Sequence, residues 1–352
     1  MLDVMGVNTD IAEGADLPDA EVRTLADLAQ LAGVSAGTVS RALAGSSLVK
    51  PKTRDRIQAL AREHGFRPNQ MASKLRTRRT GVIGVVIPLG HERRQHISDP
   101  FFMTLLGHLA DELTESGYDL MLSRAIPEEN PDWLERLTRS GMVDGVIVIG
   151  QSNQFDAIEK AAHGYANMVV WGSRRDGQHH LVVGTDNRAG GRLAAQRLIA
   201  GGAQRLAFVG DTAGIEIAER LTGVREVAGP ADRPVLHLPC HLSDDTMESE
   251  LRTQLARHQS DFDGIVAASD LIAMTAIKVL REQGRAIPGD IQIVGFDDLP
   301  LAAQTMPPLT TIRQDIAGGA KAMVERLRMA IDGRAGSSLV MDPVLMERQS
   351  TR

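Results

Sequence analysis

The stretch LADLAQLAGVSAGTVSRALAG, residues 25–45, decides the fold of the N-terminal part of the chain. Its apolar residues recur at the spacing of one helical face, which predicts a first helix over residues 24–32 that Gly33 ends. Ser35 can cap a second helix that runs to Leu43. Two short helices joined by so tight a turn are typical of a helix-turn-helix unit.

A third helix is expected from Pro51 to Gly65, because proline is favoured in the first helical turn and glycine after the last. One face of this helix carries four residues that we expect to point inward: Ile57, Leu60, Ala61 and His64. Together the three helices predict an all-α domain over residues 23–68. A basic linker that could become a helix follows at residues 69–80.

The basic charge of the chain is concentrated in this N-terminal part. Residues 23–80 hold twelve Lys or Arg residues and three acidic residues, a balance of +9, although the whole chain carries a net charge of -6. Such a local excess attracts a polyanion through the release of counterions. Because the second helix can lie in a major groove, we predict double-stranded DNA as the partner. The alternative interpretation is an ordinary helical hairpin.

Candidate DNA contacts lie at the start of the first helix and around the second. Side-chain hydroxyl groups there suit phosphate oxygens, and an arginine can read a guanine. The predicted DNA-binding residues of the head are Thr24, Ser35, Ala36, Gly37, Thr38, Ser40 and Arg41.

Residues 81–352 alternate short Val- and Ile-rich runs with helical stretches. The strand-like runs are GVIGVVIP, YDLMLS, VDGVIVIG, MVVWG, LVVGTD, RLAFVGD, PVLHLP, GIVAAS and IQIVGFDD. The helical stretches cover residues 103–116, 131–140, 154–163, 188–200, 244–258, 270–283 and 315–332. This alternation predicts parallel sheets covered by helices on both faces. About ten strands are too many for one simple unit, so we expect two α/β lobes.

The first 22 residues predict a disordered leader, because they hold six acidic and no basic residues and show no sustained periodicity. They also lack the apolar segment of a secretory signal, and no part of the chain approaches the roughly 18 apolar residues of a membrane span. We therefore expect a cytoplasmic protein with no membrane partner. A single cysteine, Cys240, cannot form an intramolecular disulfide.

Two segments, TLADLAQLAGVSAGTVSRAL and RPNQMASKLR, resemble the head and the hinge of the lac repressor family. The resemblance covers about residues 23–352 and continues through SDPFFMTLLGHLADELTESGYDL, GMVDGVIVIG, TDNRAGGRLAAQRLI, AERLTGV, VAASDLIAM, IVGFDDLP and PPLTTIRQD. It implies a transcriptional repressor controlled by a small molecule, with a periplasmic-binding-protein-like sensor over residues 81–352. It also implies a homodimer whose hinge helices form only on a pseudo-palindromic operator. A mono- or disaccharide is the effector that the family implies, and a purine or a phosphosugar stays open.

In the hinge, Asn69, Ala72 and Leu75 match the family, in which the leucine wedges into the minor groove at a central base step. The alternative is a linker leucine packed against the head. Ala36 and Gly37 depart from the family, whose members often carry larger base-reading side chains there. Direct readout is then expected to be thin, with more of the specificity carried by thymine-methyl contact and DNA deformation.

The resemblance also implies an effector site. Asp297 follows the run IQIVGF, and ligands of α/β lobes bind beyond the carboxyl ends of strands. In the family this aspartate and an arginine that matches Arg220 hold the ligand, and Asp270 matches an acidic position beside the pocket. A helix cap or a structural ion pair is the alternative for each.

Aromatic residues complete this predicted site, because an aromatic ring can stack on a sugar face. Asp99, Phe101 and Phe102 match the pocket segment of the first lobe, and Trp171, near Ser173, is a candidate ring platform. Packing in the core is the alternative for the aromatic residues. The predicted effector-binding residues are Asp99, Phe101, Phe102, Trp171, Ser173, Arg220, Asp270 and Asp297.

Other motifs carry less weight. His179 and His180, like His237, Cys240 and His241, lack a complete metal-ligand spacing, so solvated loop histidines are favoured and neither a metal nor a cofactor is expected. The sequence shows no phosphate loop, dinucleotide fingerprint or serine elbow, which argues against an enzyme such as a sugar kinase or a dehydrogenase. A solute-binding transport protein would share the sensor fold but not the basic head. No heptad pattern is seen near the end of the sequence, so we expect a dimer rather than a tetramer.

The hinge assignment predicts the effect of Leu75→Ala. The substitution should reduce operator bending and operator affinity while effector binding by the sensor is retained, because the wedge exists only in the DNA complex. The bend angle of the complex, measured on wild type and variant, tests this. A normal bend in the variant complex would reject the intercalating role.

Overall fold

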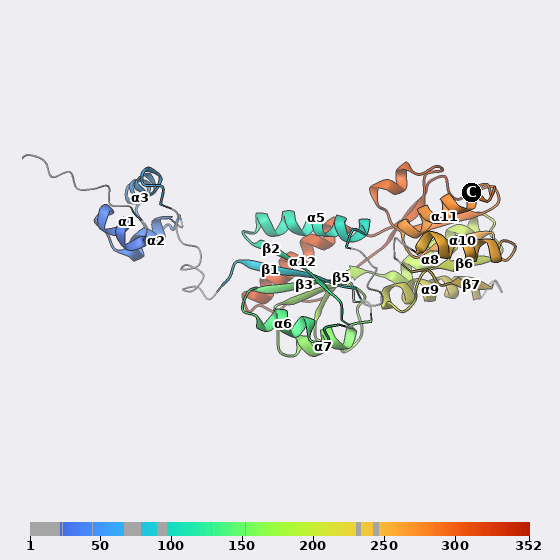
Figure 1. The fold of residues 1–352 in the computed structure, drawn as a ribbon, viewed down its shortest axis with the longest axis horizontal. Helices are drawn as coiled ribbons and strands as arrows, with labels where there is room; N and C mark the ends of the chain where they lie inside the picture. Colours follow the sequence, from blue (N-terminus) through green and yellow to red (C-terminus); the bar gives the residue numbers. More distant parts are fainter. Residues whose placement is uncertain are drawn as a thin grey trace, which may run out of the picture. The chain divides into compact units, whose positions relative to one another are not determined.

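The computed structural model describes residues 22, 24–43, 45–66, 79–89, 97–127, 129–151, 153–229, 234–241 and 246–352. By its internal contacts the chain divides into two compact units, Met1–Arg79 and Thr80–Arg352 (Figure 1). Two sets of predicted residues lie outside the described part: the expected leader apart from Val22, and the hinge residues Asn69, Ala72 and Leu75.

The first unit contains the three predicted helices: α1 (Leu25–Ala32), α2 (Ala36–Leu43) and α3 (Pro51–Glu63). One side chain from each helix, Leu28, Val39 and Ile57, is fully buried in their shared core. Each of these residues comes from the apolar face of its own helix, so the amphipathic pattern alone determines how the three helices pack.

Local signals determine where these helices begin and end. Thr24 and Asp27 form a reciprocal capping box at the start of α1, and Gly33 ends that helix in the left-handed conformation with φ of 62°. The Ser35 hydroxyl oxygen accepts from the backbone N–H of Thr38 at 3.2 Å, which caps α2. The Gly33 stop and the Ser35 cap are the signals predicted from the sequence, whereas the capping box at Thr24 was not predicted.

One inward-facing residue of α3 is predicted wrongly. His64 is exposed because α3 ends at Glu63, and His64 itself is the C-cap, where the backbone leaves the helical geometry. Gly65 then turns the chain with φ of 61°, and Phe66 packs into the core instead. The 3.6-residue periodicity therefore stops one residue earlier than its extrapolation suggests.

The second unit consists of two α/β lobes, each built on a six-stranded sheet. Lobe 1 has the strand order β11-β5-β4-β3-β1-β2, and lobe 2 has the order β12-β10-β9-β8-β6-β7. Lobe 1 contains β1 (Val82–Pro88), β2 (Asp119–Ala125), β3 (Gly145–Ile149), β4 (Met168–Trp171), β5 (Leu181–Thr185) and β11 (Leu339–Met341). Lobe 2 contains β6 (Leu206–Val209), β7 (Val235–Leu238), β8 (Gly264–Ala267), β9 (Gln292–Asp297), β10 (Thr310–Arg313) and β12 (Val344–Met346).

Helices cover both faces of each sheet, as the nearly continuous burial of the central strands requires. In lobe 1 the faces are covered by α5 (Pro100–Glu115) and α12 (Ile316–Ile331) on one side and by α6 (Trp133–Arg139) and α7 (Phe155–Ala162) on the other (Figure 1). Lobe 2 contains α8 (Asn187–Ala200), α9 (Ile215–Ala228), α10 (Met247–Arg257), α11 (Asp270–Glu282) and the short 3-10 helix η2 (Pro300–Gln304). The described strand pairs are parallel except for β10 with β12.

The chain crosses between the lobes three times, after β5, after β10 and after β11. The expectation of two lobes is confirmed, but the sequence pattern missed α9 and the strands β10, β11 and β12. The three strands are only three or four residues long, and the polar residues Glu216, Glu219 and Arg220 interrupt the first turns of α9. Helix α5 also begins earlier than expected, because Asp99 caps it and proline occupies its first turn.

Helices α8 and α9 lie in close contact because each has a glycine at the crossing. A Cβ atom added at Gly191 would overlap the backbone carbonyl of Arg220, and one added at Gly223 would overlap that of Arg188. No side-chain rotation relieves such an overlap with backbone. The two glycines therefore fix the position of α9, and with it the position of Arg220.

We predict that Gly223→Ala lowers the free energy of unfolding by about 1 to 3 kcal/mol, because α8 and α9 must move apart. Gly107→Ala is the matched control: Gly107 lies within α5, and a Cβ atom there would meet no atom within 4 Å. The control should stabilise the protein by about 0.5 to 1 kcal/mol through the unfolded chain. Urea unfolding of both variants measures the difference. Equal stability of the two variants would mean that the helix crossing adapts without cost.

Candidate functional site

The two lobes meet where several strands of both sheets end. In lobe 1, Gln151 follows β3 and Ser173 follows β4, while Asn187, the first residue of α8, lies where the chain crosses from β5 to lobe 2. In lobe 2, Asp297 ends β9, and Arg220 comes from α9. We call the region where these side chains meet the interlobe boundary. The carboxyl ends of parallel strands are the usual ligand-binding edge of such sheets.

Two hydrogen bonds join lobe 1 directly to α9 of lobe 2. The hydroxyl of Ser173 donates to the Glu219 carboxylate at 2.6 Å, and the backbone N–H of Gln151 donates to the Glu216 carboxylate at 3.3 Å. The side-chain amide of Asn187 donates to the Ser173 hydroxyl oxygen at 2.9 Å. Burial raises the pKa of both Glu216 and Glu219, because it disfavours their charged forms.

Arg220 is buried and held on several sides. Its Nε donates to the Asn187 side-chain oxygen at 2.8 Å, its Nη1 donates to the carbonyl of Ala268, and its guanidinium lies 3.7 Å from the centroid of the Phe296 ring. Burial lowers the pKa of Arg220, while the nearby carboxylates, that of Asp297 first, act in the opposite direction. The guanidinium is therefore a fixed positive charge at a fixed position.

Asp297 lies at the end of β9 in a conformation that is unusual for a residue with a side chain. Its φ is 121°, and such strained backbone costs about 1 to 3 kcal/mol. Gln314 donates to its Oδ1 at 2.7 Å. Burial raises the pKa of Asp297, Arg220 opposes this, and the carboxylates of Asp270 and then Asp99 raise it further. Asp99 belongs to lobe 1, so an electrostatic interaction links these two predicted residues across the two lobes.

Four predicted residues of lobe 1 lie close together at the start of α5 and the end of β4: Asp99, Phe101, Phe102 and Trp171. Asp99 accepts from the backbone N–H of Phe101 at 2.8 Å and so fixes the start of α5. The half-buried Phe101 ring lies 5.9 Å from the ring of Trp171 and 5.8 Å from that of Phe102. Trp171 is only 4% exposed and its ring packs on Gly319 of α12. Of the two interpretations of Trp171, a ring platform or packing in the core, this geometry fits packing in the core beside Phe101.

Asp270 differs from its expected place beside the pocket. It is fully buried, and its two carboxylate oxygens accept from the Thr311 hydroxyl at 2.5 Å and from the backbone N–H of Leu299 at 2.7 Å. Both oxygens are thus used inside lobe 2, where they fix the segment that follows β9. Burial raises the pKa of Asp270 to about 7. The structural alternative fits this geometry better than direct contact with a ligand.

Several polar residues of the boundary were not predicted from the sequence: Gln151, Asn187, Glu216, Glu219 and Gln314. Three of them, Gln151, Asn187 and Gln314, stand within two residues of the end of a strand. That position is a signal that the sequence does contain. The two glutamates belong to α9, whose existence the pattern missed.

In the first unit, the predicted contact residues surround one end of α2. Ser35, Ala36, Gly37 and Arg41 are exposed, and the Ser35 and Thr38 hydroxyls lie 2.9 Å apart. The other two are Thr24, which is exposed and caps α1, and Ser40, which is half-buried. The Arg41 Nε donates to the carbonyl of Gly37 at 3.0 Å, so the side chain lies along the exposed face of the helix. Most of these side chains are thus accessible to solvent, with Arg41 of the last turn of α2 as the basic residue among them.

The structure also shows the surroundings of His179, His180 and Cys240, which belong to the two discounted metal-ligand motifs. His180 is 3% exposed, which contradicts the expectation of a solvated loop histidine, and its Nδ1 lies 2.6 Å from the Glu159 carboxylate. His179 is exposed and also contacts Glu159. Cys240 is buried, and burial raises the pKa of its thiol to about 12. A thiol of this kind stays protonated and unreactive at neutral pH.

Comparison with known proteins finds one matching family model for each of the two units. Residues 24–69 match the family model described as bacterial regulatory proteins, lacI family, and residues 195–351 match the periplasmic binding protein-like domain. The HTH-type transcriptional regulator CelR of Thermobifida fusca is 31% identical over 93% of this chain and 98% of its own length. The chain belongs to the lacI family of bacterial regulatory proteins. It is a DNA-binding transcriptional regulator under the control of a small-molecule effector.

Two further similarities extend this comparison. The sucrose operon repressor of Streptococcus mutans is 31% identical to the regulator over 88% of this chain and 93% of its own length. A solved structure of a CelR–cellobiose complex matches with a TM-score of 0.66 at 31% identity, covering 93% of this chain and 99% of that one. The predicted fold class, an all-α head with a two-lobed sensor, is confirmed. Within the described residues, no helix is both long and apolar enough to span a membrane.

The buried Asp270 predicts a pH dependence of stability. Its pKa is about 7 in the folded regulator and about 4 in an unfolded chain, so the folded state binds the extra proton between these values. The stabilising contribution of this proton is complete below about pH 4 and is lost as the pH rises through about 7.

We therefore expect Asp270→Asn to change this profile. The melting temperature of wild type relative to the variant should fall as the pH rises from 5 to 8, because asparagine has no proton to lose. Asp342→Asn, at an exposed position, serves as the control and should follow wild type over the same range. Parallel profiles for wild type and Asp270→Asn would show that Asp270 does not titrate in the folded regulator between pH 5 and 8.

Proposed function

We propose that the regulator is a homodimeric repressor whose effector is a neutral mono- or disaccharide bound at the interlobe boundary. The observation that carries this proposal is the buried Asp297 at the carboxyl end of β9, which interacts electrostatically with Arg220 and with Asp99 of the opposite lobe. On lobe 1, the aromatic Phe101 adjoins Asp99, since its backbone N–H donates to the Asp99 carboxylate. Carboxylates accept strong hydrogen bonds from hydroxyl groups, and an aromatic ring offers a face on which a sugar ring can stack. The complex of the relative CelR with cellobiose supports the same class of ligand.

The charge at the boundary favours a neutral sugar over a phosphosugar. Four carboxylates, those of Asp99, Glu216, Glu219 and Asp297, act on one another or on Arg220 there. The Arg220 guanidinium is already engaged by Asn187 and by the carbonyl of Ala268. An added phosphate would bring further negative charge to carboxylates that already repel one another, whereas sugar hydroxyl groups can donate hydrogen bonds to carboxylates. A purine would use the aromatic ring but would supply fewer donors.

For the DNA-bound state we propose the arrangement that the family resemblance implies. Residues 23–68 form the head, residues 69–80 form the hinge, and two copies grip a pseudo-palindromic operator in the cytoplasm. The Ser35 and Thr38 hydroxyls contact phosphates, and Arg41 leaves its contact with Gly37 to reach a base edge. The basic balance of this part of the chain supports that role.

Effector and operator are then linked through the relative placement of the lobes. A sugar held by Asp99 on one lobe and by Asp297 on the other favours the lobe arrangement in which both contacts form. The hydrogen bond between Ser173 and Glu219 joins the lobes beside Arg220. Because the hinge precedes β1 of lobe 1, a change in lobe placement alters the spacing of the two hinges in a dimer. The coupling is reciprocal, so the operator alters effector affinity by the same factor.

Asp297→Ala tests the effector site. We expect effector affinity to fall by about 2 to 4 kcal/mol, because each lost hydrogen bond to a charged group contributes about 1.5 to 3 kcal/mol. Operator affinity without effector should stay nearly unchanged, and the operator complex should no longer respond to the sugar. Calorimetric titration with cellobiose, glucose, ribose and a phosphosugar, paired with operator titration, measures both properties on wild type and variant.

Asp298→Asn is the matched control, because the Asp298 carboxylate is held by Arg313 and Arg348 inside lobe 2. It should lose stability but keep effector affinity. If Asp297→Ala binds the effector as wild type does, Asp297 is a structural residue and the proposed site is wrong. If operator binding collapses together with the melting temperature, Asp297 maintains the fold instead.

A further inference from the structure

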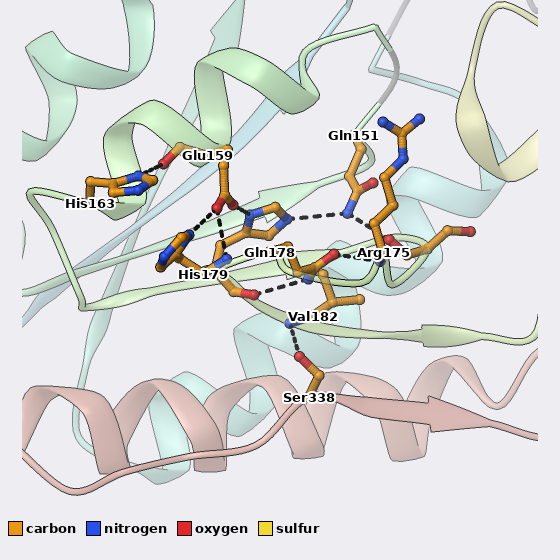
Figure 2. Close-up of polar contacts among 10 residues, drawn as sticks. Gln151, Glu159, His163, Arg175, Gln178, His179, Val182 and Ser338 are labelled. Carbon is orange, nitrogen blue, oxygen red and sulfur yellow. Dashed lines mark hydrogen bonds and ion pairs between the residues drawn. The ribbon is translucent and has the colours of Figure 1, made fainter.

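A cluster of two histidines and a glutamate lies on lobe 1, outside the interlobe boundary (Figure 2). Glu159 and His163 stand four residues apart, on α7 and at its C-terminal end, so they share one helical face. His179 comes from the segment between β4 and β5. One potential ligand atom from each of the three residues lies within 4.8 Å of the other two.

His163 has its ring in the tautomer that a metal requires. Its Nδ1 lies 2.8 Å from the backbone carbonyl oxygen of Glu159, and a carbonyl oxygen can only accept, so Nδ1 carries the hydrogen. The lone pair then belongs to Nε2. Histidines that bind metals commonly donate their other ring N–H to a carbonyl or a carboxylate in this way. The centroid of this ring lies 4.1 Å from that of His179, and both residues are exposed to solvent.

Contacts with neighbouring protein groups hold the Glu159 carboxylate in place. Its Oε2 lies 2.6 Å from Nδ1 of the buried His180, and its Oε1 accepts from the backbone N–H of His179 at 2.8 Å. His180 is in turn within 3.4 Å of the Gln151 side-chain amide. Figure 2 shows His179 beside the Glu159 carboxylate and His163 beside the Glu159 backbone. A carboxylate fixed by such outer contacts is oriented before any ligand arrives.

We propose that Glu159, His163 and His179 form a binding site for a divalent transition-metal ion such as Zn²⁺. Two imidazoles and one carboxylate are donors that Zn²⁺ prefers, whereas Mg²⁺ and Ca²⁺ prefer oxygen ligands alone. Tetrahedral Zn²⁺ places its ligand atoms roughly 3.4 Å apart, so a modest rotation of the two exposed rings completes the site. Three protein ligands leave a fourth position for water.

This proposal differs from the sequence-based interpretation of His179 as a solvated loop histidine without a metal. The sequence offers no complete ligand spacing around His179, because the other two ligands are 16 and 20 residues upstream on a different element. A competing explanation exists: the exposed His179 and Glu159 form an ion pair that needs no metal. The two explanations differ at His163, since the ion pair does not require its side chain and the metal site does.

The test is calorimetric titration of the metal-free full chain with ZnCl₂, on wild type and on His163→Ala. We expect one Zn²⁺ per chain in wild type and at least a tenfold weaker binding in the variant. His258→Ala is the matched control, because His258 is a histidine paired with one carboxylate, that of Asp261 at 2.8 Å, on lobe 2. This control should bind Zn²⁺ as wild type does, and MgCl₂ should not compete.

Because His163 is exposed, the variant should melt at the wild-type temperature, which separates lost ligation from lost folding. Co²⁺ provides a second readout, since two imidazoles and a carboxylate in a tetrahedral site give absorption bands that should be strong in wild type and lost in Glu159→Gln. Equal Zn²⁺ affinity of wild type and His163→Ala would overturn the proposal in favour of the ion pair. So would wild-type binding that MgCl₂ displaces.

Discussion

The sensor depends on the contacts made by one buried charged group, the guanidinium of Arg220. A charge removed from water needs compensation from every side, and here the compensation comes from three different parts of the chain. Asn187 lies at the first crossing between the lobes, Ala268 follows β8, and Phe296 and Asp297 end β9. The arginine therefore holds the ends of these strands in one arrangement. Its own position follows from Gly191 and Gly223, which let α9 approach α8 closely.

The same region has an excess of hydrogen-bond acceptors. Burial raises the pKa of Glu216, Glu219 and Asp297, and mutual repulsion between carboxylates adds to this effect. The positive φ of Asp297 adds local strain at the same point. Each of these features is energetically unfavourable when no ligand is bound between the lobes. A ligand rich in hydroxyl donors would relieve them, because it supplies the hydrogen atoms that the boundary lacks.

The head could be predicted almost completely from the sequence because its signals are local. The Ser35 cap, Gly33 and the apolar face of each helix act over a few residues. The sensor pattern gave the two lobes but not α9, since its first turns carry polar residues for the boundary rather than a regular apolar face. Short strands such as β11 are recognisable only from the sheet that they join.

For the site residues too, features set by nearby sequence could be predicted, whereas features set by distant residues could not. The approach of Asp297 and Arg220 was expected from the family resemblance, and the carboxyl end of a strand explains the position of Asp297. The burial of Trp171 depends on Gly319, nearly 150 residues further along the chain, and the two hydrogen bonds of Asp270 depend on Leu299 and Thr311. No periodicity within a short window contains such information.

The three crossings between the lobes also determine the order in which the protein can fold during its synthesis. The head has its own core and is complete once residue 66 has been made. Lobe 1 begins at β1 but needs α12 for one face of its sheet and β11 for its edge, so it cannot finish before Met341 leaves the ribosome. At about 5 to 20 residues per second, this interval is roughly 15 to 55 seconds. A head able to contact DNA is thus present on each nascent chain well before the sensor that controls it.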